Sequence, residues 1–298
     1  MKRQRACIIG GTGFVGRHLL TRLGNAGYHC VVPTRRAFRH RDLKLYPQVE
    51  LHELEDATSY AALFADCSLV VNLAGILNES GGASFQAVHV DLVREIVAAA
   101  QAAGVPRLLH MSALHADAAQ GNSAYLRSKG AGEDVVHGAD LQVTSFRPSV
   151  IFGRGDSFFN RFRSLLEMAP GVVPLACPQA QFAPVWVEDV VDAMVRSIDD
   201  ERTVGQRYDL CGPRVLTLQA LMTYTARRLG KRVWIIGLDD KRSQLMARVF
   251  DKLPGAPLTL DNYLSMQTPS VCNEHNGLLQ LGIHPTDIDT IVPTYLGA

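Results

Sequence analysis

One glycine-rich turn near the amino terminus limits what this chain can fold into. Residues 8–16 read IIGGTGFVG, an apolar run that breaks at Gly10 and continues as a helical pattern from Val15. Glycines three residues apart suit a tight turn, a close approach of backbone to a diphosphate, and packing of a helix on a strand. The unpaired N–H groups at such a helix start attract an anion. The pattern predicts a dinucleotide cradle, with contacts from Gly10, Thr12, Gly13, Phe14, Val15 and Gly16.

The rest of the first half repeats this alternation of short apolar runs and amphipathic stretches. Val15, Leu19, Leu20 and Leu23, for example, fall on one helical face. Strands that alternate with helices form parallel sheets, and continuously apolar strands are covered on both faces. We therefore predict an α/β fold, a Rossmann-type doubly wound parallel sheet with a small C-terminal lobe. The expected strands are 6–9, 29–32, 49–53, 69–73, 107–111 and 143–146.

The sequence changes in texture after Arg147. Prolines become frequent between 148 and 184, and the expected helices 187–196 and 218–229 are separated by irregular connections. We expect all 298 residues to form one unit. Its dinucleotide-binding part spans roughly residues 1–150, and a small mixed lobe with a covering arm spans roughly 151–298.

Composition excludes several classes of protein. Thirty basic and 29 acidic residues give a formal charge of +1, which provides no overall field for nucleic acid or anionic lipid. The six cysteines form no C-x-x-C pair and the ten histidines show no metal-binding spacing, so we expect reduced, mostly buried thiols and no metal site. The apolar run 6–9 is too short for a signal peptide or a membrane span. We expect a cytoplasmic protein, or one peripheral to the inner membrane.

The end of the second predicted strand indicates which dinucleotide is bound. Sites for NAD place a carboxylate there, whereas this chain has Arg35 and Arg36. A guanidinium grips a 2′-phosphate with two charge-assisted bonds, which favours NADP(H) over NAD(H). The alternative is a solvated basic loop that also contains Arg39, Arg41 and Lys44.

Two further strand ends are expected to contact the cofactor. Glu53 ends the third strand and is a candidate acceptor for the adenine amine, although an exposed carboxylate there is equally ordinary. Leu73, Ala74 and Gly75 end the fourth strand, where small residues would let the ribose lie against the backbone. A plain turn is the alternative.

Tyr125 and Lys129 stand one helical turn apart. A phenol works as an acid or base near neutral pH only if its anion is stabilised. An ammonium on the same helical face, together with an oxidised nicotinamide, would lower the pKa of the phenol. The same ammonium would hold the ribose hydroxyls. The pair is thus a candidate for both cofactor binding and proton transfer.

Taken together, these motifs resemble the extended short-chain dehydrogenase/reductase family. The residues behind the resemblance are the glycine turn, Tyr125 with Lys129, Arg147-Pro148, and residues 72–75 and 184–189. In more detail the chain is similar to an atypical group, the NADPH-binding accessory subunit of respiratory complex I and its bacterial relatives. That narrower likeness is carried by residues 32–35, 110–114, 125–129, 151–154 and 281–286.

The resemblance implies how the site is built and where it departs from active relatives. Tyr125 and Lys129 would lie by the nicotinamide ribose, Pro148 and Val150 beside the ring, and Met111 among the cofactor contacts. Active relatives carry a Ser or Thr where this chain has Ala113, and an Asn where it has His89. Loss of such a hydroxyl donor costs on the order of a hundred- to a thousandfold in rate. Ser112 would replace it only if the strand end twists or bulges, since neighbours on a strand face opposite ways.

Three functions remain open from the sequence. The first is an NADP(H)-binding protein with weak or no dehydrogenase activity, serving as a structural or assembly factor of a respiratory complex. The second is an active NAD(P)-dependent oxidoreductase or nucleotide-sugar epimerase or dehydratase, with Tyr125 as acid/base and Ser112 polarising the carbonyl. The third is quinone reduction by NADPH. Residues 243–253 are expected to pack on the sheet, with docking on a partner or membrane as the alternative.

Overall fold

A seven-stranded parallel sheet forms the centre of the molecule, in a computed structural model that describes residues 4–54, 59–251 and 258–297. The strand order is β3-β2-β1-β4-β5-β6-β11, and every neighbouring pair is parallel. The predicted fold class is confirmed. The strands are β1 (Arg5–Ile9), β2 (His29–Thr34), β3 (Val49–Glu53), β4 (Cys67–Asn72), β5 (Arg107–Met111), β6 (Gln142–Pro148) and β11 (Arg207–Leu210).

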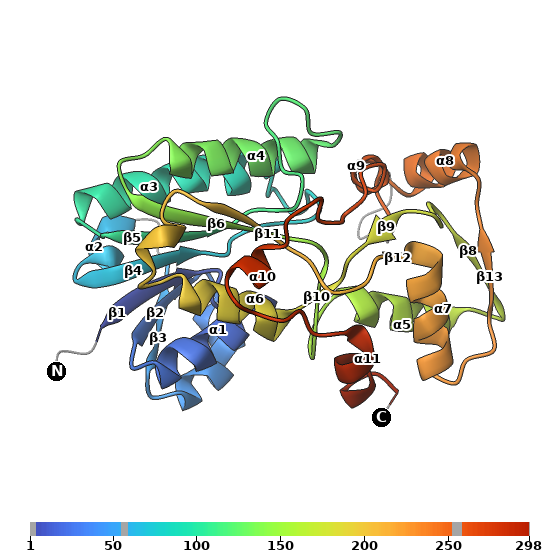
Figure 1. The fold of residues 1–298 in the computed structure, drawn as a ribbon, viewed down its shortest axis with the longest axis horizontal. Helices are drawn as coiled ribbons and strands as arrows, with labels where there is room; N and C mark the ends of the chain where they lie inside the picture. Colours follow the sequence, from blue (N-terminus) through green and yellow to red (C-terminus); the bar gives the residue numbers. More distant parts are fainter. Residues whose placement is uncertain (1–3, 55–58, 252–257, 298) are drawn as a thin grey trace.

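Helices cover both faces of this sheet (Figure 1). Alternation along β1 sends Ala6 and Ile8 to one face and Cys7 and Ile9 to the other. Burial of both sets explains why the strands are apolar throughout. The first face carries α1 (Phe14–Asn25), α6 (Val187–Arg196) and α10 (Gly277–Gln280); the second carries α2 (Tyr60–Phe64), α3 (Leu92–Ala102) and α4 (Ala124–His137).

The order in which strands are added to the sheet reverses between β1 and its neighbour β4: β2 and β3 lie on one side of this point, and β5 and β6 lie on the other. In open α/β sheets ligands bind in the crevice outside the carboxyl ends of the strands at such a point. The glycine turn after β1 and residues 73–75 after β4 therefore meet at one edge of the sheet. The central sheet and its covering helices also include elements that follow residue 150, namely β11, α6 and α10. The chain therefore returns to the sheet after it has entered the lobe.

The C-terminal lobe has its own apolar core, to which Phe152, Phe159, Phe162, Leu221 and Met222 contribute. Helices α5 (Phe158–Met168) and α7 (Leu218–Arg228) contribute to it. Three small sheets belong to the lobe: β7 (Ile151–Phe152) with β10 (Val185–Trp186), β8 (Val172–Leu175) with β13 (Trp234–Gly237), and β9 (Gln181–Phe182) with β12 (Leu216–Thr217). The lobe and its arm also contain α8 (Asp240–Phe250), the shorter helices α9 (Leu260–Ser265) and α11 (Ile288–Ile291), and the 3-10 turn η4 (Val292–Thr294).

Three irregular helical segments lie elsewhere in the chain. They are the 3-10 helices η1 (Ala37–Leu45) and η3 (Glu201–Thr203) and the π-helical turn η2 (Ala87–Asp91).

Two sequence expectations are wrong. Cys211 and Cys272 form a disulfide that ties the arm after α9 to the end of β11, although Cys7, Cys30, Cys67 and Cys177 are free. Sixty-one residues separate the pair, so only the return of the arm to the sheet brings them together.

Helix α8 also differs from expectation, because it does not pack on the central sheet. Leu245 is 62% exposed and Val249 is 56% exposed, while Met246 and Phe250 line a cavity in the lobe. Residues 252 and 253 of the predicted segment lie outside the described residues. No helix in the described ranges is both long and apolar enough to cross a membrane.

Candidate functional site

The turn after β1 has a shape that only glycine adopts easily. Gly10 has a φ of +79°, and a Cβ on it would lie 2.9 Å from the carbonyl carbon of Leu73. The N–H of Gly13 donates to the carbonyl of Gly10 over 2.9 Å, which closes the turn. A Cβ on Gly16 would lie 2.5 Å from the Cα of Gly11, so the helix start packs directly on the turn. The turn, β4 and α1 are thereby held in close contact.

The amino end of α1 is arranged to receive an anion. Gly13 caps the helix in extended conformation without a side-chain hydrogen bond, and the first turn contains no acidic residue. The N–H groups that follow, starting with Phe14 and Val15, and the helix dipole favour a negative group here. A Cβ on Gly13 would reach to 3.1 Å from the Gly10 carbonyl oxygen, filling the space above the turn. This cradle fits the diphosphate of a dinucleotide.

Arg35 and Arg36 follow β2 directly and are both exposed. In the part of the chain that the structure describes, neither guanidinium forms an ion pair, whereas nearby Arg17 pairs with Asp42 and donates to the Thr12 carbonyl oxygen over 3.1 Å. Two cations with no ion-pair partner among the described residues therefore lie at the strand end where an adenosine ribose would bind. Glu53, at the end of β3, accepts a 3.3 Å hydrogen bond from the N–H of Ala37 and so also orders this loop.

The end of β4 is fixed by Asn72, a buried residue. Its amide oxygen accepts from the N–H of Ala74 over 3.0 Å, and its nitrogen contacts Nδ1 of His110 at 3.2 Å. Burial lowers the pKa of His110 well below its usual value, so the ring is neutral and accepts at Nδ1. This arrangement aims the backbone of Leu73, Ala74 and Gly75 across the crevice.

Lys129 is buried and points toward the same crevice. Its ammonium donates a 2.5 Å hydrogen bond to the carbonyl of Met111, and a Cβ on Gly75 would lie 3.8 Å from Nζ. Burial lowers the pKa of Lys129 to about 8, an effect that Glu133 partly opposes. Lys129 is therefore mostly charged at neutral pH, with capacity for further hydrogen bonds beside Gly75.

Tyr125 does not have the lowered pKa that its spacing from Lys129 predicts. Burial raises the pKa of its phenol to about 12, and the carboxylate of Asp261 adds to the rise. The ring packs edge-on against Phe85 and His89. Tyr125 is thus a neutral phenol at neutral pH, and its side chain lines a cavity.

Ser112 does not take the place of the missing hydroxyl. Its Oγ donates a 3.2 Å hydrogen bond to Glu133, whose carboxylate also accepts from Arg147 over 2.9 Å. Ala113 lines the cavity beside Tyr125, and Ser112 faces the opposite way because the strand end keeps its alternation. The sequence hypothesis that Ser112 polarises a carbonyl is therefore wrong for this geometry.

His89 is built into the scaffold on the other side of Tyr125. Its Nε2 accepts from the N–H of Ile76 over 3.0 Å, so Nδ1 carries the proton that is shared with Ser128 Oγ at 2.9 Å. Burial and the nearby Lys129 charge lower the pKa of His89 to about 3. It lies in a π-helical turn, and a Cβ on Gly132 would come within 2.0 Å of its carbonyl oxygen. His89 is therefore a neutral residue that holds the backbone at Ile76 and the side chain of Ser128 in place.

Asp261 is a site residue that the sequence reasoning missed. Its carboxylate accepts from the N–H of Ala124 at 2.7 Å and of Tyr125 at 3.2 Å, capping α4 from the arm. Asn262 of α9 also donates to the Leu77 carbonyl, so α9 bridges the loop after β4 and the start of α4. The capping box of Thr259 and Asn262 is the one local signal of this helix.

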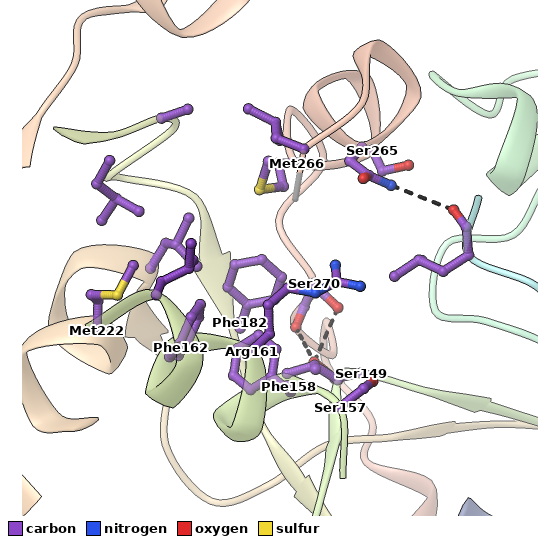
Figure 2. Close-up of a pocket in the computed structure, with 18 of the residues that line it drawn as sticks. Ser149, Ser157, Phe158, Arg161, Phe162, Phe182, Met222, Ser265, Met266 and Ser270 are labelled. Carbon is purple, nitrogen blue, oxygen red and sulfur yellow. Dashed lines mark hydrogen bonds between the residues drawn. The ribbon is translucent and has the colours of Figure 1, made fainter. Parts of the chain in front are cut away.

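A cavity of about 710 Å³ opens from this point into the lobe. Phe14, Ala113, Tyr125, Pro148 and Val150 line its cofactor end, so the structure brings these predicted residues together. Figure 2 shows the lobe side, where Phe158, Phe162, Phe182 and Met222 surround the space. The arrangement can hold a nucleotide at the sheet edge and a second molecule in front of it.

Comparison with known proteins places the chain in a family. The model of the NAD dependent epimerase/dehydratase family matches residues 6–211. The chain belongs to this family, and the resemblance to atypical short-chain dehydrogenases is confirmed. It is 33% identical over 296 residues to the mitochondrial NADH dehydrogenase (ubiquinone) 1 alpha subcomplex subunit 9 of Mus musculus, covering 95% of this chain and 77% of that protein.

Solved structures agree on the fold. An NADPH-dependent quinone oxidoreductase from Escherichia coli, complexed with NADPH, superposes with a TM-score of 0.75 at 18% identity, covering 96% of this chain and 97% of that one. UDP-glucuronic acid 4-epimerase from Bacillus cereus, in complex with UDP-glucuronic acid and NAD, gives 0.67 at 17% identity, covering 94% and 98%. Both neighbours thus carry a nicotinamide dinucleotide on this architecture.

Proposed function

We propose that this chain is an NADP(H)-binding member of the family with weak or no dehydrogenase activity, serving as a structural or assembly component of a respiratory complex. One contrast supports the proposal. The chain has the residues expected to bind the dinucleotide, whereas Ala113 occupies the position where active relatives carry the hydroxyl that polarises a substrate carbonyl. A site that keeps its binding residues and lacks a catalytic donor is suited to retain a cofactor for stability.

The residues of this chain have defined parts in holding the nucleotide. The first turn of α1 would bind the diphosphate, and the backbone of residues 73–75 would contact the ribose. Lys129 would supply donors for the ribose hydroxyls, while Pro148 and Val150 would exclude water beside the ring. A bound nicotinamide would supply hydride chemistry. Tyr125, with its raised pKa, keeps its proton at the phenol oxygen at neutral pH.

The preference for NADP(H) rests on Arg35 and Arg36. They are exposed at the end of β2, they lack ion-pair partners within the described ranges, and no carboxylate occupies the position after Thr34. A 2′-phosphate would give both guanidinium groups an anionic partner, whereas the hydroxyl of NAD would leave them solvated.

Thermal unfolding tests this preference. NADPH should raise the Tm more than NADH does, and Arg35→Ala with Arg36→Ala should remove most of the difference. Arg39→Ala with Arg41→Ala, two exposed arginines further along the same loop, is the matched control and should leave it intact. Equal shifts for both nucleotides in the unaltered protein would contradict the assignment.

The respiratory partner is proposed from the likeness to the mouse subunit, which spans most of both chains. The same likeness supports a location peripheral to the inner membrane. Tagged protein isolated from gently solubilised membranes should co-migrate with NADH dehydrogenase activity on a native gel. Migration of all the protein away from that activity would contradict this part of the proposal.

A working oxidoreductase is the second candidate, because Tyr125 still lines the cavity where a substrate would lie. Ala113→Ser separates the two. Carbonyl reduction that is already fast in the unaltered protein, and unchanged by this substitution, would favour the second candidate. A gain of roughly a hundredfold from a near-zero rate would identify a disabled enzyme.

A further inference from the structure

The cavity in front of the nicotinamide site has a composition that neither nucleotide binding nor a structural role explains. Its volume of about 710 Å³ falls within the range of roughly 300–1,000 Å³ found for small-molecule sites. Aliphatic, aromatic and methionine side chains form most of the wall. An apolar space of this size costs stability unless something fills it. The question is which kind of molecule fits.

Polar groups gather on one side of this space. The hydroxyl groups of Ser149 and Ser270 lie 3.0 Å apart, and that of Ser149 donates to the carbonyl of Ser270 (Figure 2). Tyr125 also lines the cavity. Phe162 and Met222 lie on the opposite side in the same view. A molecule with a polar head and an apolar remainder would match this division.

Among the described residues that line the cavity, one carries a positive charge. Arg161, on the first turn of α5, is the only Lys or Arg among the described lining residues, and within the described ranges it has no ion-pair partner. Arg163, two residues on, pairs with Glu167 over 2.8 Å. An unpaired guanidinium beside hydroxyl groups favours a head that carries a carboxylate or phosphate.

The lobe end of the cavity reaches an exposed apolar surface. Met168 is 74% exposed and Val172 is 48% exposed, yet both line the cavity. Trp234, 78% exposed, pairs with Val172 across β8 and β13. Contiguous exposed apolar residues at the end of an apolar cavity provide a path for a hydrocarbon chain that extends beyond it.

We propose that the cavity binds an amphiphile with a single long hydrocarbon chain and an acidic head. The head lies at the Tyr125, Ser149 and Arg161 end, and the chain runs between α5, α7 and α8 toward Met168. A nucleotide sugar does not suit this wall, because its hydroxyl groups would lose water without gaining partners. The proposal rests on the proposed function only in placing the head next to a nicotinamide; the chain site itself needs no nucleotide.

Titration calorimetry with decanoate, dodecanoate and tetradecanoate, each below its micelle concentration, tests this directly. Every methylene that enters the cavity should tighten binding about fourfold, because burial of a CH₂ contributes about 0.8 kcal/mol. Tetradecan-1-ol, which lacks the carboxylate, should bind more weakly than tetradecanoate. Arg161→Gln should weaken the binding of tetradecanoate by a similar factor and leave the binding of tetradecan-1-ol unchanged. Arg163→Gln is the control and should change neither.

Variants at two neighbouring positions on α8 distinguish binding in the cavity from adsorption to the surface. Met246→Glu places a charge in the cavity and should abolish binding of tetradecanoate. Leu245→Glu alters an exposed position one residue away and should leave it within twofold. Equal losses in the two variants, or an affinity that ignores chain length, would overturn the proposal in favour of adsorption to the surface.

A measurement on the unaltered protein covers the case in which Met246→Glu fails to fold. A photoreactive tetradecanoate should crosslink to peptides from α5 and α8, and crosslinks confined to other elements would refute the site. Titrations with and without NADPH keep the two proposals apart. Chain binding without any NADPH binding would remove only the proposed function, and NADPH binding without chain binding would remove only this inference.

Discussion

The two ends of the crevice are built by different means. At the sheet edge, backbone groups of the glycine turn and of residues 73–75 form the cradle, and local sequence determines their positions. On the lobe side, side chains from α5, α7 and α8 and from the returning arm enclose an apolar space, and only the tertiary fold brings them together. The binding of a nucleotide is thus a property of a short motif, whereas the choice of a second ligand depends on long-range packing.

The arm should be the more sensitive of the two regions to covalent change. The disulfide between Cys211 and Cys272 closes a loop of 61 residues, for which chain entropy predicts about 4 kcal/mol of stabilisation. Cys211→Ser should lower the free energy of unfolding by about that amount in urea titrations. Cys177→Ser, at a free cysteine, should change it far less, and a reducing agent should bring the unaltered protein to the level of Cys211→Ser. Indifference to both treatments would contradict a structural disulfide.

The cradle should respond through binding rather than stability. Gly13→Val would fill the space above the Gly10 carbonyl, so affinity for NADPH should fall at least a hundredfold while the Tm without nucleotide changes by only a few degrees. Gly27→Val is the reference for a glycine with open space around it, where backbone strain at its φ of +89° would reduce stability and spare binding. Unchanged NADPH affinity in Gly13→Val would refute the cradle.

His89 should make the stability of the protein depend on pH. Its folded pKa of about 3 lies below its usual 6.5. The unfolded chain therefore takes up a proton below about pH 6.5 that the folded ring refuses, and stability falls as the pH drops through this window. Between pH 7 and pH 5 this one histidine should lower the free energy of unfolding by about 2 kcal/mol.

The comparison of variants isolates this effect from other groups, including His110. His89→Asn should reduce the fall in stability between pH 7 and pH 5 by about 2 kcal/mol, while His275→Asn, at an exposed position, should keep the full response. Parallel curves for the unaltered protein and His89→Asn would show that another group carries the pH dependence.

Asp261 should give the smallest change. Asp261→Asn removes the charge that caps α4, which should cost about 1 kcal/mol. Because the carboxylate also raises the pKa of Tyr125, the substitution should lower that pKa, as seen in an ultraviolet titration of the phenol. Asp140→Asn, at an exposed position after α4, is the control, and a Tyr125 pKa that moves equally in both variants would argue against direct contact.

The sequence predicts the sheet, the glycine turn and the facing of Ala113, because each follows from spacing along a single strand or helix. It does not predict the cap from Asp261 or the pairing of Cys211 with Cys272, since both depend on where the arm returns. The raised pKa of Tyr125 does not follow from the sequence for the same reason. Burial causes it, together with a carboxylate from a distant segment.

The nucleotide that co-purifies with the native protein would show directly whether the cradle holds NADP(H). Protein purified without added nucleotide can be denatured, and the released small molecules separated by chromatography and identified by mass. We expect NADP⁺ or NADPH in amounts approaching one per chain. Release of NAD⁺ or NADH alone, or of no nucleotide together with no Tm response to added NADPH, would contradict it.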